Sequence, residues 1–374
     1  MKITCDKQQL QNALSLVARA VSSRTSMAIL ECVLLTAQKD KGLTLYGSDK
    51  EISIDIATIY ADIEDEGSVA LNAKLFTDIV RKLSGNSVSL EVDEKFNVTC
   101  HSGRSKLRIV GQPGDEFPTV PEHELSQVNH RYVINASKLR AMIMQTSFSV
   151  ALDQSKLILT GELVDIKDNI FQLVAIDMFR ISYVSLNMPE GTPDIKAVIP
   201  AKGLNELARM LPAESDLEVS FCFTPNRVVF EADNFRMISI LLHGDFIRFD
   251  QVHNDDFSTM IVASKQELLG AFERVILVAE DGKMVPAKFE IQDDEVMITT
   301  KTEKGIVEDR VPCQTEGNDL IIYFNPRYFI EALKAIDDDS VVLKFNNVLS
   351  PCSVRGLDES LGNKYLIVPL RPPN

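Results

Sequence analysis

Three segments of the chain carry an apolar stripe at helical spacing, each directly after a polar residue that can cap a helix. The capping residues are Asp6, Asn135 and Ser264. The stripes comprise Leu10, Ala13, Leu14, Val17 and Val21; Leu139, Met142 and Ile143; and Leu268, Leu269, Phe272, Val275 and Ile276. The even spacing of about 128 residues is far longer than a solenoid repeat, and it predicts three domain-sized copies of one unit.

A second helix is predicted in the latter half of each copy, and each leads into an alternating strand. In the third copy, Asn325-Pro326 places proline at the first helical position, a common helix start. The second helices begin near Asn72, Pro200 and Asn325, and the strands after them cover Ser87–Val92, Asp216–Phe221 and Ser340–Phe345. The intervening segments alternate as strands. Two helices and many strands per copy predict an α+β fold with helices packed on antiparallel sheets.

Turn signals close the first two copies and suggest the domain boundaries. Gly114-Asp115-Glu116-Phe117 and Gly244-Asp245-Phe246 each follow a predicted strand. We therefore predict domains at residues 1–127, 128–255 and 256–374. The joints around Pro121–Asn129 and His253–Phe257 are not rich in glycine or serine, which predicts semi-rigid linkers. If the ends of such an array are complementary, two chains can close head to tail into a ring.

The predicted helices are more basic than the chain as a whole. The net charge of −15 argues, taken alone, against nucleic-acid binding. Basic residues nevertheless recur on the helices of all three copies: Lys7, Arg19, Lys74, Arg81 and Lys82; Lys138, Arg140, Lys202 and Arg209; and Lys265, Arg274, Arg327 and Lys334. For any one of them a solvated helix face is the better interpretation. Their recurrence favours a basic wall that contacts phosphates without recognising bases.

The sequence contains none of the common catalytic or metal-binding motifs. There is no Walker A motif, no G-x-G-x-x-G, no G-x-S-x-G and no H-E-x-x-H. The six cysteines form no C-x-x-C pair and indicate a reducing cytoplasm. No apolar stretch approaches the length of a membrane helix. We predict no catalytic residue, cofactor, metal site or membrane association.

Two alternatives to a DNA-binding role follow from the same pattern. The first is a protein-interaction scaffold built of three α+β repeats that does not bind DNA. The second is a hydrolase whose acidic site forms only in the folded protein, because adjacent acids such as Asp255-Asp256 can serve acid–base chemistry. Acids in turns are far more often solvated surface, so we expect no turnover.

Several short motifs, taken in order, resemble the bacterial DNA polymerase III beta subunit family. They are Met1-Lys-Ile, Arg24-Thr-Ser-Met-Ala-Ile-Leu-Glu, Gly114-Asp-Glu-Phe-Pro118, Ala175-Ile-Asp-Met-Phe-Arg180 and Tyr365-Leu-Ile-Val-Pro-Leu-Arg371. With the three repeats, they cover essentially the whole chain. The resemblance implies a DNA sliding clamp and processivity factor without catalytic activity. It would be a head-to-tail homodimer of six domains with helices lining the hole, opened by an ATP-driven clamp loader, in the bacterial cytoplasm and at the nucleoid through DNA.

The resemblance also implies one partner-binding pocket per chain, between the second and third domains. DNA polymerase, the clamp loader and repair proteins would insert a Gln-Leu-x-Leu-Phe-type peptide there. The implied wall consists of Leu159, Ile176, Arg180, Ile181, Val252, Met284, Asn325, Tyr328, Pro351, Leu366, Val368, Pro369, Leu370 and Arg371. Its apolar members form an adaptable slot for leucine and phenylalanine. The chain departs from the family pattern at Met178-Phe179, Ile247, Gln251 and Pro372-Pro373-Asn374, so its peptide preference stays open.

The same resemblance implies DNA contacts and a dimer interface. It points to Arg24 and Lys202 on the inner wall, and to Lys156 next to Leu157-Ile158, where some members carry tyrosines. With the helix residues, the predicted set that contacts double-stranded DNA independently of sequence is Arg24, Lys74, Lys138, Lys156, Lys202 and Arg209. At the dimer interface, Leu107 is expected to pack near Ile276 and Leu277 of the partner subunit.

Overall fold

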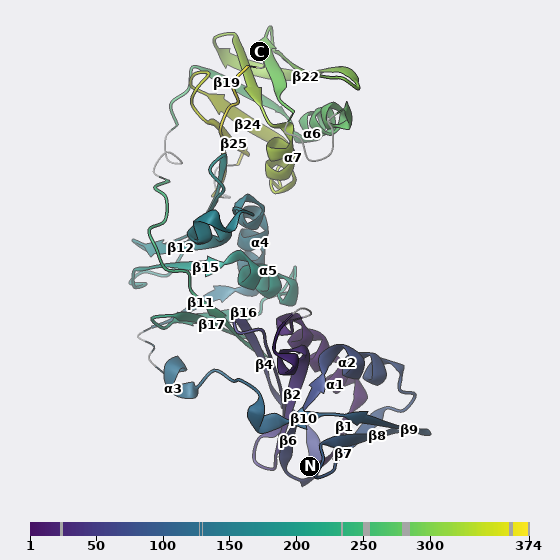
Figure 1. Ribbon diagram of the computed structural model, residues 1–374. Helices are drawn as coiled ribbons and strands as arrows, with labels where there is room; N and C mark the ends of the chain where they lie inside the picture. The colour runs from purple at the N-terminus through teal and green to yellow at the C-terminus, as the bar shows by residue number, and fades with distance from the viewer. Residues whose placement is uncertain are drawn as a thin grey trace. The chain divides into compact units, whose positions relative to one another are not determined.

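The computed structural model describes residues 1–22, 25–126, 128, 130–232, 235–249, 255–278, 285–358 and 362–372. The chain divides into two compact units, which are coloured along the sequence in Figure 1. Unit 1 comprises Met1–Lys138 and Arg209–Leu241, and unit 2 comprises Leu139–Ala208 and Leu242–Asn374. Each unit therefore combines one complete repeat with part of the second repeat.

The first helix of each repeat begins where the sequence predicts it. These helices are α1 (Lys7–Val17), α4 (Ala136–Thr146) and α6 (Lys265–Val275). The Asp6 carboxylate accepts the Gln9 N–H at 2.9 Å, and the Asn135 amide oxygen accepts the Lys138 N–H at 3.1 Å. The Ser264 hydroxyl accepts the Glu267 N–H in the same way. Each cap satisfies a backbone donor that has no partner within its helix, which explains why the helices begin there.

The second helix of each repeat is also present. These helices are α2 (Ala73–Lys82), α5 (Ala201–Met210) and α7 (Pro326–Lys334). Asn72 caps α2 and Asn325 caps α7, with Pro326 at the first helical position as predicted. The strands after α2 and α7 have the predicted bounds. The strand after α5 begins at Glu218 and not at Asp216, because the Ser215 hydroxyl accepts the Leu217 N–H at 3.0 Å in a preceding turn.

Unit 1 is built on two antiparallel sheets. The first has the order β5-β1-β7-β8-β9 and the second β10-β6-β2-β3-β4-β18-β17-β16-β11. Their strands are β1 (Lys2–Asp6), β2 (Cys32–Gln38), β3 (Gly42–Ser48), β4 (Ile52–Ile59), β5 (Ala61–Asp65), β6 (Gly67–Asn72), β7 (Ser87–Val92), β8 (Asn97–Ser102), β9 (Ser105–Val110), β10 (Gln112–Pro113), β11 (Arg131–Asn135), β16 (Glu218–Phe223), β17 (Arg227–Ala232) and β18 (Phe235–Ile240). Helices α1 and α2 pack side by side against them (Figure 1).

The second sheet of unit 1 continues from the first repeat into the second. Strand β4 pairs with β18, with Asp55 opposite Arg236. The Arg236 guanidinium also donates to the Asp55 carboxylate at 2.7 Å and to Glu122 at 2.8 Å. Glu122 begins the short helix α3 (Glu122–Leu125), on the segment that connects the first two repeats. Backbone pairing and this ion-pair network therefore both fix the junction.

Unit 2 is organised by one antiparallel sheet of order β15-β12-β13-β14-β26-β25-β24-β19-β22-β21-β20-β23. Its strands are β12 (Gly161–Lys167), β13 (Ile170–Ile176), β14 (Arg180–Asn187), β15 (Ile195–Pro200), β19 (Thr259–Ser264), β20 (Ala287–Gln292), β21 (Glu295–Thr302), β22 (Gly305–Gly317), β23 (Leu320–Phe324), β24 (Ser340–Phe345), β25 (Cys352–Gly356) and β26 (Asn363–Ile367). The pairing of β14 with β26 joins the second and third repeats, and it places Ile181 opposite Leu366.

The core of the third repeat lies between this sheet and helices α6 and α7, which pack side by side (Figure 1). Phe272 of α6 stacks on Phe329 of α7, with ring centroids 5.0 Å apart, and Phe289 and Phe324 complete the aromatic cluster. Buried aromatic rings of this kind contribute large apolar areas to a core. The third predicted helix stripe therefore faces this core, with Leu268, Phe272 and Val275 buried in it.

The short helical turns complete the described elements. They are η1 (Ala18–Ala20), η2 (Ala28–Glu31), η3 (Gly114–Glu116), η4 (Ser147–Ser149), η5 (Gln154–Thr160) and η7 (Ile276–Val278). In the part of the chain that the structure describes, no helix combines the length and apolar character required to cross a bilayer.

Candidate functional site

An apolar cluster in unit 2 brings together four of the predicted pocket residues. Leu159, Ile176 and Leu366 are buried in it, and Ile181 packs against them. They come from η5, β13, β26 and β14, so the β14–β26 pairing between two repeats creates the cluster. The cluster is largely buried in the single chain, and of its four members Leu366 also lines a cavity.

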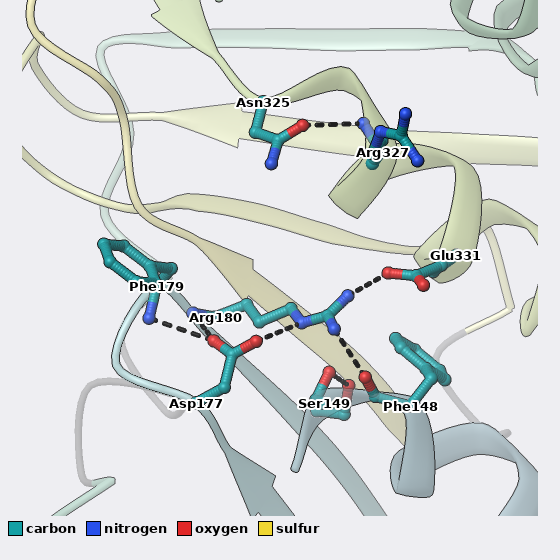
Figure 2. A network of polar contacts seen from close by, with 9 residues as sticks. Phe148, Ser149, Asp177, Phe179, Arg180, Asn325, Arg327 and Glu331 are labelled. Atoms are coloured by element: carbon teal, nitrogen blue, oxygen red, sulfur yellow. Dashed lines mark hydrogen bonds and ion pairs between the residues drawn. The ribbon is translucent and has the colours of Figure 1, made fainter. Parts of the chain in front are cut away.

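Arg180 lies at the polar border of this cluster and makes several contacts at once (Figure 2). Its guanidinium donates to the Asp177 carboxylate at 2.8 Å, to the Glu331 carboxylate and to the Phe148 carbonyl oxygen. Its Cζ atom lies 4.6 Å from the Tyr328 ring centroid, within the range of a cation–π contact. Only 10% of the Arg180 side chain is exposed. Arg180 therefore links the elements that form the site.

The turn between β13 and β14 is held by Asp177. Its carboxylate accepts the N–H groups of Phe179 and Arg180, each at 3.1 Å, in addition to the Arg180 side chain. These bonds hold Met178 at φ +79°, a conformation that costs a non-glycine residue on the order of 1 kcal/mol. Met178 and Phe179 are exposed at the border of the cluster. The departure from the family pattern at these two positions thus places two apolar side chains at the surface.

Asn325 and Tyr328 form the α7 side of the site. Asn325 is buried and its side-chain oxygen accepts the Arg327 N–H at 3.1 Å, so it serves first as a helix cap (Figure 2). Burial raises the pKa of the Tyr328 hydroxyl, and the nearby Asp177 carboxylate raises it further. The Tyr328 hydroxyl is therefore neutral at physiological pH and can donate a hydrogen bond to a ligand.

The C-terminal segment borders the same cluster. The Val368 N–H donates to the Phe179 carbonyl at 2.8 Å, and the Leu370 N–H donates to the Tyr323 carbonyl at 2.7 Å. Val368, Pro369 and Leu370 are half-buried, whereas Arg371 is exposed. Pro351 and Leu366 line a cavity of about 240 Å³ together with Lys344 and Ser353. The backbone bonds place the tail beside the β13–β14 turn and the end of β23.

The structure thus gathers most of the predicted pocket residues in unit 2. Val252 and Met284 lie outside the described residues, as does Gln251. The contacts of Arg180 with Phe148, Asp177 and Glu331 were not predicted from the sequence. Asp177 could have been inferred, because aspartate at the start of a tight turn commonly binds the following N–H groups. Phe148 and Glu331 meet Arg180 only through the tertiary fold.

The predicted DNA-contacting residues are distributed over several elements. Lys74 on α2, Lys138 on α4, and Lys202 and Arg209 on α5 are exposed, and Arg24 lies outside the described residues. Lys156 lies on η5, where its ammonium group approaches the Met178 sulfur at 3.5 Å. Lys156 therefore borders the apolar cluster and does not belong to a helix face.

The predicted dimer residues lie at strand edges and helix ends. Leu107 is half-buried on β9, which pairs with β8 and has no second partner strand among the described residues. Leu277, in η7, is 75% exposed, while Ile276 packs partly against the third-repeat core. Strand β22 pairs with β19 only over Cys313–Gly317, so its first half has a partner, β21, on one side alone within the described part of the chain.

The cysteine side chains are free thiols, and all but Cys313 are buried. All six cysteines are free, and burial raises the pKa of the Cys5 thiol to about 12 and that of Cys100 to about 11. Thiols with such high pKa values are poor nucleophiles. Within the described ranges, no group of three or more His, Cys, Asp or Glu side chains is arranged to hold a metal ion.

Three family models match consecutive parts of the chain. The N-terminal domain of the DNA polymerase III beta subunit matches residues 1–121, the central domain residues 133–247 and the C-terminal domain residues 251–371. The matches follow the order of the three repeats predicted from the sequence.

Relatives and solved structures agree with these models over the whole length. The beta sliding clamp of Bacillus subtilis is 31% identical over 99% of this chain and 100% of its own, and that of Staphylococcus epidermidis is 30% identical over 99% of both. The crystal structure of a DNA polymerase III beta subunit from Eubacterium rectale superimposes with a TM-score of 0.94 at 34% identity, over 99% of both chains. The Bacillus subtilis sliding clamp structure gives 0.93 at 29% identity, over 100% of both. The chain therefore belongs to the family of DNA polymerase III beta subunits, the beta sliding clamps.

Proposed function

We propose that this protein is a DNA sliding clamp that encircles duplex DNA and tethers the replicative polymerase and other replication and repair proteins to it. The observation that carries the proposal is the match of all three beta-subunit domains, in order, along one chain. Three clamp domains at residues 1–127, 128–255 and 256–374 belong to the same proposal. A scaffold that does not bind DNA is the alternative, and no feature of the described residues favours it.

The ring is proposed to close by pairing of strand edges from two copies of the chain. Strand β9 of one copy would add to the first half of β22 of the other, because each has a row of backbone groups without a partner strand among the described residues. Exposed Lys106 on β9 and Glu308 on β22 supply opposite charges. Such a contact joins two different surfaces, so two copies close head to tail.

The inner wall of the ring is proposed to contact DNA phosphates through the exposed basic residues of the helices. Lys74, Lys138, Lys202 and Arg209 are the described members of this set, and Arg24 is the further member that the family resemblance implies. Lys156 is proposed to reach DNA from η5. Contacts to phosphates depend on charge and not on base sequence, so they allow the ring to slide.

The protein itself is proposed to catalyse no reaction. Its contribution is topological, because a closed ring cannot leave circular DNA without opening. The energy for opening would come from an ATP-driven clamp loader. The loader, the polymerase and repair proteins are proposed to bind the unit 2 pocket through short Gln-Leu-x-Leu-Phe-type peptides, with the leucine and phenylalanine against the cluster of Leu159, Ile176, Ile181 and Leu366.

A retention assay tests the ring directly. The clamp, loaded with its clamp loader and ATP onto nicked circular DNA, is expected to remain bound during gel filtration in about 0.5 M salt, which weakens ordinary electrostatic binding by orders of magnitude. Cutting the circle once with a restriction enzyme should release it. Loss in high salt before cutting, or retention on the linear product, would contradict the topological link and favour the scaffold alternative.

Removal of the tail tests the peptide pocket. Deleting Pro369–Asn374 removes the wall segment that Leu370 anchors to Tyr323, and a Gln-Leu-Ser-Leu-Phe peptide should then bind at least about 100-fold more weakly, a loss of about 2.7 kcal/mol. Fluorescence anisotropy of the labelled peptide measures this.

The matched control for the tail deletion is removal of Pro372–Asn374 alone. Pro372 is exposed, and the anchored residues stay in place, so the affinity should change less than about threefold, under 1 kcal/mol. Circular dichroism should show the same melting temperature for both truncations. Equal affinities of the long deletion and the intact protein would remove the tail from the pocket.

A further inference from the structure

Glu162 is a completely buried acid in unit 2, and no cation among the described residues is its partner. It is the second residue of β12, between buried Gly161 and Leu163, and its exposed fraction is 0%. One carboxyl oxygen, Oε2, is hydrogen-bonded to the Thr146 hydroxyl. The other, Oε1, has no hydrogen-bond partner among the described residues. An ionised carboxylate in such a position is strongly unfavourable, because nothing replaces its lost hydration.

The Thr146 hydroxyl lies within hydrogen-bond distance of more acceptors than it has protons. The Thr146 oxygen lies 2.9 Å from the Met142 carbonyl oxygen, as is common for a threonine within a helix. A hydroxyl group has a single proton, and a carbonyl oxygen can only accept. Thr146 is placed to donate to the Met142 and Ile143 carbonyl oxygens and to Glu162 Oε2, so three acceptors compete for one proton, and a proton on the carboxyl group removes this competition.

The buried environment of Glu162 favours the protonated form of its carboxyl group. Burial raises the pKa of Glu162 to about 8, and the hydrogen bond with Thr146 acts in the opposite direction without cancelling it. The charged side chains of the surrounding elements, Arg140 on α4, Lys167 on β12 and Lys196 on β15, do not contribute to this shift. Glu162 is therefore neutral at pH 7 and ionises as the pH rises through about 8.

The residue bonded to Glu162 ends the helix that leads into the Arg180 network. Thr146 is the last residue of α4, and η4 follows it directly. Within η4, the Phe148 carbonyl accepts the Arg180 guanidinium, and the Ser149 hydroxyl lies 2.5 Å from that of Ser182 on β14 (Figure 2). The turn is thus attached to β12 at its start and to β14 at its end.

We propose that Glu162, as the neutral acid, is a positioning residue that holds the α4–η4 turn against β12 and thereby keeps Phe148 in place for Arg180 at the peptide site. Ionisation of Glu162 releases this hold, so the site weakens in alkaline solution. The proposal rests on the peptide-binding role proposed above, and it adds a proton-dependent control of that site. Glu162 itself touches no ligand and acts through Thr146 and η4.

The sign of the effect follows from the raised pKa. The folded protein keeps a proton on Glu162 up to about pH 8, whereas the unfolded chain loses it near the ordinary value of 4.5. The neutral form therefore supports the site fully at pH 7 and is lost above pH 8. If only the neutral form binds peptide, the dissociation constant at pH 9 should be about tenfold higher than at pH 7.

The first experiment measures binding of an N-terminally labelled Gln-Leu-Ser-Leu-Phe peptide by anisotropy from pH 6 to 9.5. The intact protein is expected to lose about tenfold in affinity between pH 7 and 9, because the fraction of neutral Glu162 falls by that factor. Glu162→Gln keeps a neutral hydrogen-bond donor, so its affinity at pH 7 should match that of the intact protein and stay constant with pH. Glu162→Leu, which cannot form the bond, should bind weakly at every pH. Identical pH profiles for the intact protein and Glu162→Gln would overturn the proposal.

The second experiment detects the turn without any peptide. The chain contains no tryptophan, so Phe148→Trp places the only tryptophan of the protein in η4, where its emission can be excited selectively. Its emission should change with a midpoint near pH 8 and lose that change when Glu162→Gln is added. A constant emission in Phe148→Trp would overturn the positioning role. Absence of peptide binding at pH 7 would instead refute the proposed pocket, and the fluorescence titration would still decide the role of Glu162.

Discussion

Replacing Arg180 with alanine is expected to lower the free energy of unfolding of unit 2 by about 3 kcal/mol, because the Asp177 carboxylate would lose its cation in a largely buried position. The Phe148 carbonyl would lose a donor at the same time. The same variant should lose binding of the Gln-Leu-Ser-Leu-Phe peptide, since Tyr328 and the β13–β14 turn would no longer be held together. Urea denaturation gives the stability change, and anisotropy gives the affinity.

Glu331→Ala is the matched control for this variant. Glu331 contacts the same guanidinium, but its side chain is about half exposed, so its removal should cost less than about 1 kcal/mol. Arg180→Lys should fall between the two, because an ammonium group cannot replace several directed guanidinium bonds. Equal stability losses for Arg180→Ala and Glu331→Ala would show that Arg180 does not organise the site.

Replacing Leu277 with lysine is expected to convert the dimer into monomers at micromolar concentration. Leu277 is 75% exposed in the single chain, so the change should leave folding almost unaffected. In the proposed ring the apolar side chain of Leu277 would be covered by the partner subunit. A lysine at this position would place an unpaired charge inside the interface. A rise in the dimer dissociation constant of at least about 100-fold, equal to about 2.7 kcal/mol, is expected by sedimentation velocity.

Leu349→Lys serves as the control for Leu277→Lys. Leu349 is 82% exposed, belongs to the same unit and lies in the loop between β24 and β25, outside the first half of β22 and η7. Its replacement should leave the dimer unchanged. Leu277 is preferred to Ile276 for the test, because Ile276 also packs against the third-repeat core and its replacement would destabilise the fold. A dimer that survives Leu277→Lys would contradict the proposed interface.

The helices of this protein could be located from the sequence because the capping hydrogen bonds at their N-termini are local interactions. Asp6, Asn135 and Ser264 each cap a helix through a bond to an N–H group three residues further along the chain. The bounds of β16 were two residues off, because the turn at Ser215 was not recognised. Strand partners were not specified by any local pattern, since alternation shows which face is buried but not which strand lies alongside.

For the pocket as well, the sequence indicated which residues belong to the site, and the tertiary structure showed which contacts they make. Its residues were placed by a family resemblance, and the structure gathers Leu159, Ile176, Ile181 and Leu366 in one cluster. The Arg180 side chain, expected to orient a peptide, is already bonded to Asp177, Glu331 and Phe148. Lys156, expected at the DNA, lies beside Met178. Apart from the Asp177 contact, which is local, these contacts join residues more than 20 positions apart in sequence, and no spacing rule predicts them.

The sequence by itself determined the three repeats, their helices and the clamp family, because caps, apolar periodicity and motif order are properties of short segments. Only the tertiary structure decided that sheets cross the repeat boundaries, through β4 with β18 and β14 with β26. It alone also decided that Glu162, one of the two acids of β12, is buried against Thr146. The physical reason is that burial and pairing depend on which distant surfaces meet, and that choice is made by the packing of the whole unit.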